Sequence, residues 1–138
     1  MISWKVFKKI SFAKLIKSSI RYADLSYSDL SYANLQEADI HKSSLKHANL
    51  THAHLIKTDC SDADFSHADM SWAQCIRADM RNAIFTSANL ENTNFSGAIL
   101  LNAKGFNADA KGLILCRTVM PDGTIQDRNC DIAVVQKN

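Results

Sequence analysis

Apolar residues recur at every fifth position between residues 15 and 100 of the chain. All 18 of these central positions are apolar although only 46% of the sequence is hydrophobic, a regularity that chance gives about once in a million sequences. A small residue (Ala, Ser or Thr) lies two positions before each central residue, and the position between them is usually Asp or Asn. A single five-residue unit therefore repeats over most of the chain. The central residues are Leu15, Ile20, Leu25, Leu30, Leu35, Ile40, Leu45, Leu50, Leu55, Cys60, Phe65, Met70, Cys75, Met80, Phe85, Leu90, Phe95 and Leu100.

The spacing of the inward residues excludes an ordinary helix and an ordinary strand. Central and small positions are separated alternately by two and three residues, a mean of about 2.5, whereas a helix needs 3.6 and a strand 2.0. A short extended piece explains the step of two, and a bend explains the step of three. Bends of one hand, repeated in every unit, wind the chain into stacked coils that pair as parallel strands do. Asp and Asn suit such corners because they tolerate turn conformations and bond to nearby amides.

Several units resemble the A(D/N)LXX signature of pentapeptide repeat proteins. Examples are Ala23-Asp24-Leu25-Ser26-Tyr27, Ala33-Asn34-Leu35 and Ala88-Asn89-Leu90-Glu91-Asn92. The resemblance covers about residues 11–112 and implies the fold of that family, a right-handed quadrilateral parallel β-helix with 20 residues per coil. We therefore expect an all-β solenoid of about five coils, roughly 24 Å tall at the spacing of paired strands.

Both ends of such a solenoid need caps, because an open end exposes unpaired amides and the apolar interior. We expect a single domain with three parts. Residues 1–10 form the N-terminal cap, for which a short helix is one form, residues 11–112 form the β-helix, and residues 113–138 form the C-terminal cap.

The run from Cys116 to Thr124, with the later Cys130, resembles the tail that follows the repeats in many bacterial members of the family. The residues themselves predict a hairpin that turns at Pro121-Asp122-Gly123, with Val119 opposite Thr124. Cys116 and Cys130 flank this hairpin without lying directly opposite each other. Both a disulfide and two free thiols are compatible with that placement.

Charge is unevenly distributed along the chain. Residues 1–21 contain six bases and no acid, residues 22–112 contain seven bases and eleven acids, and the whole chain has a formal net charge of +2. This balance is too weak to predict direct nucleic-acid binding. The basic start, with Trp4, Phe7 and Phe12, either touches anionic lipid or forms a cap with a solvated basic face, and we favour the cap.

The sequence predicts a cytoplasmic protein. No apolar run approaches the roughly 20 residues of a membrane-spanning helix, so no span is expected. Lys interrupts every apolar stretch at the start of the chain, which is not the pattern of a secretory signal. Reduced thiols are the default in that compartment.

Two outward columns of the predicted solenoid are aromatic. Residues 20 apart should lie one above the other, about 4.8 Å apart. Tyr and Trp are typical of interface hot spots, so we predict that these columns form a face for a protein partner, whose identity the sequence does not give. Packing of exposed rings alone also explains them, and Ile56 over Ile76 is a smaller competing patch. The six residues of the candidate interaction face are Tyr27, His47 and His67 in one column and Tyr32, His52 and Trp72 in the next.

Other columns carry groups that could bind ions. His47 over His67 has a spacing suited to a metal pair, but neither a carboxylate nor a Cys shares the column, so we expect no metal there. Asp39, Asp59 and Asp79 also form a column, which could hold a cation or imitate phosphate spacing. The repeat pattern already explains these carboxylates, because this position is usually Asp or Asn.

Nothing in the sequence predicts catalysis. Cys60 and Cys75 occupy central positions and should be buried. The sequence has no Ser–His–Asp set, Gly-rich phosphate loop or CxxC. A filled core leaves no pocket, so we expect neither catalytic residues nor a cofactor.

We therefore predict a non-enzymatic scaffold that binds another protein. The alternative comes from the resemblance, since some pentapeptide repeat proteins bind DNA gyrase as mimics of duplex DNA. This chain departs from that group because it is net positive, its solenoid is only mildly acidic, and it ends in a hairpin rather than a hydrophobic dimer interface. DNA gyrase is thus a possible but disfavoured partner.

Overall fold

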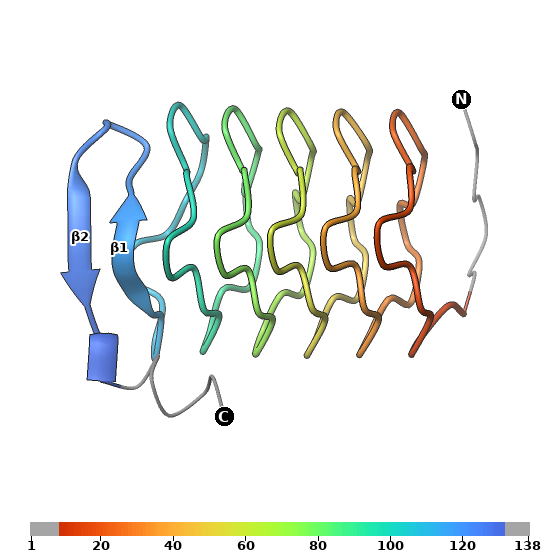
Figure 1. Ribbon diagram of the computed structural model, residues 1–138, viewed down its shortest axis with the longest axis horizontal. Helices are drawn as coiled ribbons and strands as arrows, with labels where there is room; N and C mark the ends of the chain where they lie inside the picture. Colours follow the sequence, from red (N-terminus) through yellow and green to blue (C-terminus); the bar gives the residue numbers. More distant parts are fainter. Residues whose placement is uncertain (1–8, 132–138) are drawn as a thin grey trace.

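The computed structural model describes residues 9–131, which wind into coils stacked along one axis (Figure 1). Parallel backbone bridges join residues 20 apart, and one ladder runs through Lys9, Asp29, Asn49, Asp69 and Asn89. The expected right-handed quadrilateral β-helix of about five coils is thereby confirmed. Residues 1–8 and 132–138, and with them most of the expected N-terminal cap, lie outside the described residues.

Each unit ends in a tight turn whose third residue has a positive φ. In one such turn the N–H of Ala33 donates to the carbonyl oxygen of Leu30 (3.0 Å), and Tyr32 has a φ of 58°. Equivalent non-glycine residues throughout the solenoid have φ values from 53° to 63°, and they greatly outnumber the glycines at this position. This left-handed conformation costs such a residue about 1–2 kcal/mol. None of the described non-glycine residues that adopt it is β-branched, which is the side-chain class that fits it worst.

Asp and Asn recur before the central residues because they stabilise the following turn. The Oδ1 of Asp29 accepts hydrogen bonds from the backbone N–H of Ser31 (3.0 Å) and from its Oγ (2.6 Å). The same pair of bonds recurs at Asp59, Asp64 and Asp69. These carboxylates therefore act locally, as side chains of Asx turns do.

Central residues fill the axis of the solenoid, and Leu50 and Phe65 are fully buried. Hydroxyls at the small position are buried too, and they donate to a carbonyl oxygen 23 residues earlier. Thr58 donates to Leu35 (2.7 Å), and the same bond is made by Ser43, Thr93 and Thr118. Ser28 Oγ is the one buried side-chain oxygen of the described chain without a partner, and the residue 23 positions before it lies outside that range.

Cys60 and Cys75 lie on the axis and are fully buried, as expected. Burial raises the pKa of both thiols well above the ordinary value for cysteine. Both remain protonated near neutral pH and are inert, because the thiolate is the reactive form.

The repeat becomes irregular after residue 104. Gly105 has a φ of 68°, and a Cβ there would lie 2.9 Å from the Cα of Thr86, so this position requires glycine. Phe106 packs edge-on against Phe85 (5.5 Å between centroids) and Phe95 (5.2 Å). One large ring thus covers the last phenylalanines of the axis where the regular unit is lost.

Strand β1 (Leu115–Val119) belongs to the last coil and also to the hairpin. It pairs in parallel with the preceding coil through Ile99 and Val119, and antiparallel with β2 (Ile125–Arg128). The hairpin lies at the opposite end of the rod from the coil that begins at Lys9 (Figure 1). The expected boundary at residue 112 therefore falls just before a stretch that still pairs with the coil above it.

The expected register of the hairpin is wrong by one residue near the turn, because Val119 lies opposite Ile125. The segment between Val119 and its partner is therefore one residue longer than expected. The N–H of Met120 donates to the Thr124 carbonyl (2.7 Å), and Gly123, with a φ of 86°, donates to the Met120 carbonyl (2.9 Å). A bulge between Cys116 and Thr118 then shifts the pairing.

The assigned register predicts that a carboxylate introduced on the axis prevents folding, whereas one introduced on the surface of the neighbouring coil is tolerated. Phe65→Asp places an unpaired charge on the axis and should prevent cooperative folding, a loss above about 5 kcal/mol. Ser87→Asp is the control, because Ser87 is exposed and its φ of 58° suits Asp. Urea unfolding followed by circular dichroism measures both, and equal loss in the two variants would contradict the register.

The left-handed turn position predicts that side-chain branching matters more than polarity there. Lys57 is exposed with a φ of 55°. Lys57→Ile should lower the free energy of unfolding by about 1–2 kcal/mol, because a β-branched residue is strained at this φ. Lys57→Asn removes the same charge and should be neutral or stabilising. Chemical denaturation compares the two, and an isoleucine variant as stable as the asparagine variant would argue against strain.

Candidate interaction face

The first aromatic column is a continuous stack. Tyr27 and His47 stack with 4.6 Å between ring centroids and 5° between planes, and His47 stacks on His67 at 4.7 Å and 3°. All three residues occupy the left-handed turn position, which projects their side chains from a corner of the coil. The coil spacing thus sets the stacking distance.

The second column is longer than the sequence analysis proposed. Tyr32 stacks on His52 (4.7 Å, 2°) and His52 lies parallel to Trp72 (6.0 Å, 3°). Phe12 extends the stack, with 4.9 Å and 4° to Tyr32. Sequence reasoning missed Phe12 as part of this column, although its position 20 residues before Tyr32 was a sufficient signal.

The face between the two corners is polar. Successive coils place Asp29, Asn49 and Asp69 there in one parallel ladder. Their Oδ1 atoms accept the backbone N–H of the residue two positions on, as Asn49 does from Thr51 (3.0 Å). The candidate face is therefore a flat hydrogen-bonded surface with an aromatic ridge along each side.

Stacking decides which part of each ring a partner can touch. Neighbouring rings in a column cover the faces that they turn toward each other and leave the ring edges open. Tyr27 is 58% exposed and Trp72 47% exposed despite these contacts. Their edges carry the phenol O–H and the indole N–H, so the ridges offer hydrogen bonds and edge contacts to a partner.

The stack of His47 on His67 does not favour a shared metal ion. Two parallel rings 4.7 Å apart direct their nitrogen lone pairs along parallel planes, whereas metal ligands converge on one point. Within residues 9–131 the one cluster of three potential ligand residues is Cys116, Asp127 and Cys130, but the two cysteines are joined in a disulfide and therefore offer no thiolate to a metal.

The carboxylates of the acidic column all have local partners. Asp39 lies 3.4 Å from Arg21, Asp59 accepts two bonds from Ser61, and Asp79 binds Arg81 through two hydrogen bonds (2.9 and 2.6 Å). Partial burial acts to raise the pKa of Asp79, but the hydrogen bonds and charge of Arg81 outweigh it and lower that pKa below its ordinary value. Two of its three carboxylates are thus paired with arginines, which weakens the likeness of the column to a row of phosphates.

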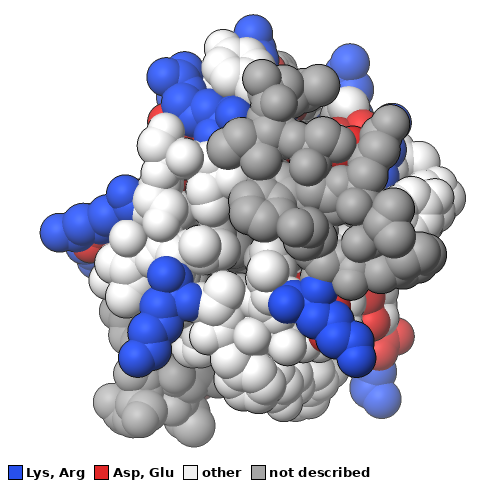
Figure 2. All heavy atoms as spheres, turned by 90° about the vertical axis from the view of Figure 1, so that its right-hand side faces the viewer, with Lys and Arg blue, Asp and Glu red and all other residues white. Residues whose placement is uncertain are grey.

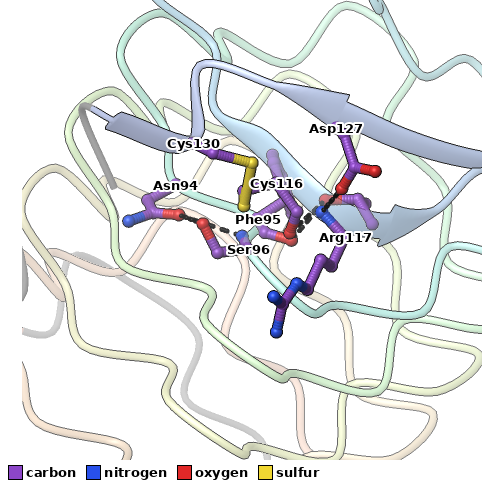
Figure 3. The surroundings of a disulfide bond; sticks show 8 residues. Asn94, Phe95, Ser96, Cys116, Arg117, Asp127 and Cys130 are labelled. Carbon is purple, nitrogen blue, oxygen red and sulfur yellow. Dashed lines mark hydrogen bonds between the residues drawn. A yellow bond between two sulfur atoms is a disulfide. The ribbon is translucent and has the colours of Figure 1, made fainter. Parts of the chain in front are cut away.

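A disulfide closes the C-terminal hairpin (Figure 3). Cys116 on β1 and Cys130 after β2 have Cα atoms 4.8 Å apart, although Cys116 pairs with Asp127 across the hairpin. The Cys116 carbonyl accepts a bond from Gly97 (2.8 Å), so the same residue joins the hairpin to the preceding coil. Of the two states left open by the sequence, the structure has the disulfide.

The competing apolar patch is less exposed than the ridges. Ile56 and Ile76 are half-buried in one column, in which Ile16 is 48% exposed. No helix within the described range is both long and apolar enough to cross a bilayer.

Comparison with known families agrees with this geometry. The family model of pentapeptide repeats matches in eight copies, over residues 10–46, 43–82, 73–101 and 83–120. The chain belongs to the pentapeptide repeat family. No protein with a curated function matches the sequence.

Several solved structures resemble it. The pentapeptide repeat protein Rfr23 from the cyanobacterium Cyanothece 51142 is 34% identical with a TM-score of 0.60, over 72% of this chain and 64% of that one. AT2G44920 from the thylakoid lumen of Arabidopsis thaliana is 27% identical, over 66% and 63% of the two chains, with a TM-score of 0.44. Trypsin-treated QnrB1, a plasmid-mediated fluoroquinolone resistance protein, is 17% identical, over 94% and 69%, with a TM-score of 0.53. This chain thus spans less than two thirds of the length of the first two, and the likeness to QnrB1 is one of fold.

The disulfide predicts a defined contribution to stability. Replacing Cys116 and Cys130 together by Ser should lower the free energy of unfolding by about 3 kcal/mol, because a crosslink closing a loop of this length restricts the unfolded chain. Urea unfolding with and without a reducing dithiol measures this. The reductant should destabilise the wild type to the level of the variant and leave the variant unchanged. A wild type insensitive to reductant would show that the bond contributes nothing.

Proposed function

We propose that this protein is a non-enzymatic scaffold whose two aromatic ridges bind a protein partner. The observation that supports the proposal is the pair of stacked columns on adjoining corners, Tyr27–His47–His67 and Tyr32–His52–Trp72. Exposed Tyr and Trp provide large contact areas at low cost in conformational entropy.

Preorganisation is the physical advantage of this face. Each stacked ring is already held by its neighbour and by a fixed turn, so binding immobilises little that is free in the unbound protein. Solenoids generally bind partners through extended faces of this kind. The filled axis also supports a non-enzymatic role, because side chains such as Leu50 and Phe65 occupy the interior that a substrate would need.

The alternative role is mimicry of duplex DNA toward gyrase, and the fold shared with QnrB1 keeps it as a candidate. Two observations disfavour it. Residues 22–112 have seven bases against eleven acids, a net charge of only −4, and Asp39 and Asp79 are paired with arginines. Duplex DNA carries one charge per about 1.7 Å, a much denser field.

The cytoplasmic location stays a prediction. The disulfide is a bond more usual in oxidising compartments. Trapping of free thiols in intact cells of the native host, followed by fractionation, tests both properties together.

The partner face can be tested by removing one ridge. Tyr32, His52 and Trp72 are each replaced by Asn, which tolerates the positive φ of that position. The matched control is Tyr22→Asn, Lys42→Asn and Asp62→Asn, at the same turn position two corners away. Crosslinking and affinity capture from the native host should yield partners that the ridge variant loses at least about 10-fold and the control retains, as expected for hot-spot residues.

Two results would contradict the scaffold model. If the ridge variant captures the same partners as the wild type, the ridge is inert and the Ile56–Ile76 patch becomes the better candidate. If the purified protein inhibits or protects gyrase supercoiling at micromolar concentration in a salt-dependent manner, the DNA-mimic role replaces the scaffold. Circular dichroism first establishes that both variants are folded.

A further inference from the structure

The first coil, residues 9–28, has exposed apolar side chains at the N-terminal end of the rod. Phe12 is 68% exposed and Ile16 is 48% exposed. Tyr32 covers one face of the Phe12 ring, and no described residue stacks on the other face. Tyr32 and His52, by contrast, have a stacked ring on both faces.

Basic side chains surround these apolar groups. Lys9, Lys14, Lys17 and Arg21 all belong to the first coil, against the single acid Asp24. Figure 2 looks onto this end and, among the residues drawn in colour, shows Lys and Arg side chains spaced around uncharged residues. Over residues 1–21 the sequence has six bases and no acid.

Two of these bases have acidic neighbours on the second coil. Lys17 lies 4.0 Å from Glu37 and Arg21 lies 3.4 Å from Asp39. The side chain of Lys17 remains 72% exposed and that of Arg21 49% exposed. Exposed ion pairs of this kind contribute little and are easily exchanged, so both cations can meet an external anion.

We propose that the N-terminal end of this protein docks on an anionic lipid surface. Basic residues are attracted to the negative surface potential of such a membrane. Apolar side chains among them enter the boundary between headgroups and acyl chains, as those of interfacial proteins do. Phe12 and Ile16 supply the apolar contact, and Lys9, Lys14 and Lys17 supply the charge.

The charge and the apolar side chains of this end favour anionic lipid over the other candidate partners, a second copy of the chain and a nucleic acid. A second copy docking end to end would bring two basic rims together, which repel each other. A nucleic acid would satisfy the bases but would leave Phe12 and Ile16 without apolar contacts. Anionic lipid complements both properties at once.

Docking through this end would stand the solenoid upright on the membrane. The aromatic ridges run along the axis from coil to coil, so they would extend away from the surface. The membrane contact and the partner face meet at Phe12, which extends the second column, and at Lys9, which continues the ladder between the columns. Lys14 and Lys17 belong to neither column, so the charge of this end can be tested separately from the rings.

The test is cosedimentation of the full-length protein with vesicles at low salt. Vesicles containing phosphatidylserine should bind at least 10-fold more tightly than pure phosphatidylcholine vesicles, and 0.5 M salt should remove most of the difference. Replacing Lys9, Lys14 and Lys17 by Gln should weaken binding at least 10-fold. The matched control, Lys57→Gln, Arg77→Gln and Lys111→Gln, makes the same charge change elsewhere and should bind as the wild type does. Phe12→Asn, which keeps the turn conformation, should weaken binding without changing its dependence on salt.

Several outcomes would overturn the proposal. Equal binding to both kinds of vesicle, no binding to either, or equal loss in the basic-end variant and its control would each exclude specific docking by this end. If duplex DNA displaces the protein from vesicles at a concentration below that of the lipid, the end is a nucleic-acid site. Self-association in sedimentation velocity that Phe12→Asn abolishes would identify a second copy as the occupant.

Discussion

Hydrogen bonds between successive coils determine where almost every side chain of this protein lies. They hold residues 20 apart in direct register, and they stabilise turns whose third residue is in a conformation that most amino acids avoid. The aromatic stacks, the hydroxyl bonds of the small positions and the carboxylate bonds at the corners all follow from that register. Without the ladder, none of these contacts would repeat.

Most of the fold could be predicted from the sequence because the determining interaction is periodic. The positions of Leu30, Leu50 and Phe65 on the axis, and the columns through His47 and Trp72, need only the five-residue spacing and the 20-residue coil. The periodic pattern predicts contacts between residues far apart in the sequence, because each residue contacts the residue 20 positions away in the next coil.

The aperiodic parts could not be predicted in the same way. The hairpin register depends on a short loop and on a bulge between Cys116 and Thr118, which a local pattern of turn residues does not reveal. The position of Phe106 against Phe85 and Phe95, like the close approach of Gly105 to Thr86, is a contact between coils rather than between neighbours in sequence. The disulfide depended on that same local geometry, so spacing alone left it open.

The two functional proposals use different consequences of one architecture. The sides of the rod repeat and form ridges, whereas its ends are unique. A protein partner that binds the ridges contacts a surface that is already rigid before binding. An anionic membrane that binds the basic end contacts the side chains of the first coil. Side and end contacts can therefore coexist on a molecule of this size.

The 20-residue coil also constrains how the length of this chain can change during evolution. One residue inserted within a coil would turn every later central residue away from the axis. Twenty inserted residues would instead add a whole coil, which makes the same contacts with the coils on either side as the existing coils do. The stretch around Phe106 leaves the regular frame and regains it by Ile114 without any net change in residue number. Length variation in such a molecule is therefore quantised, and its rods should differ by whole coils.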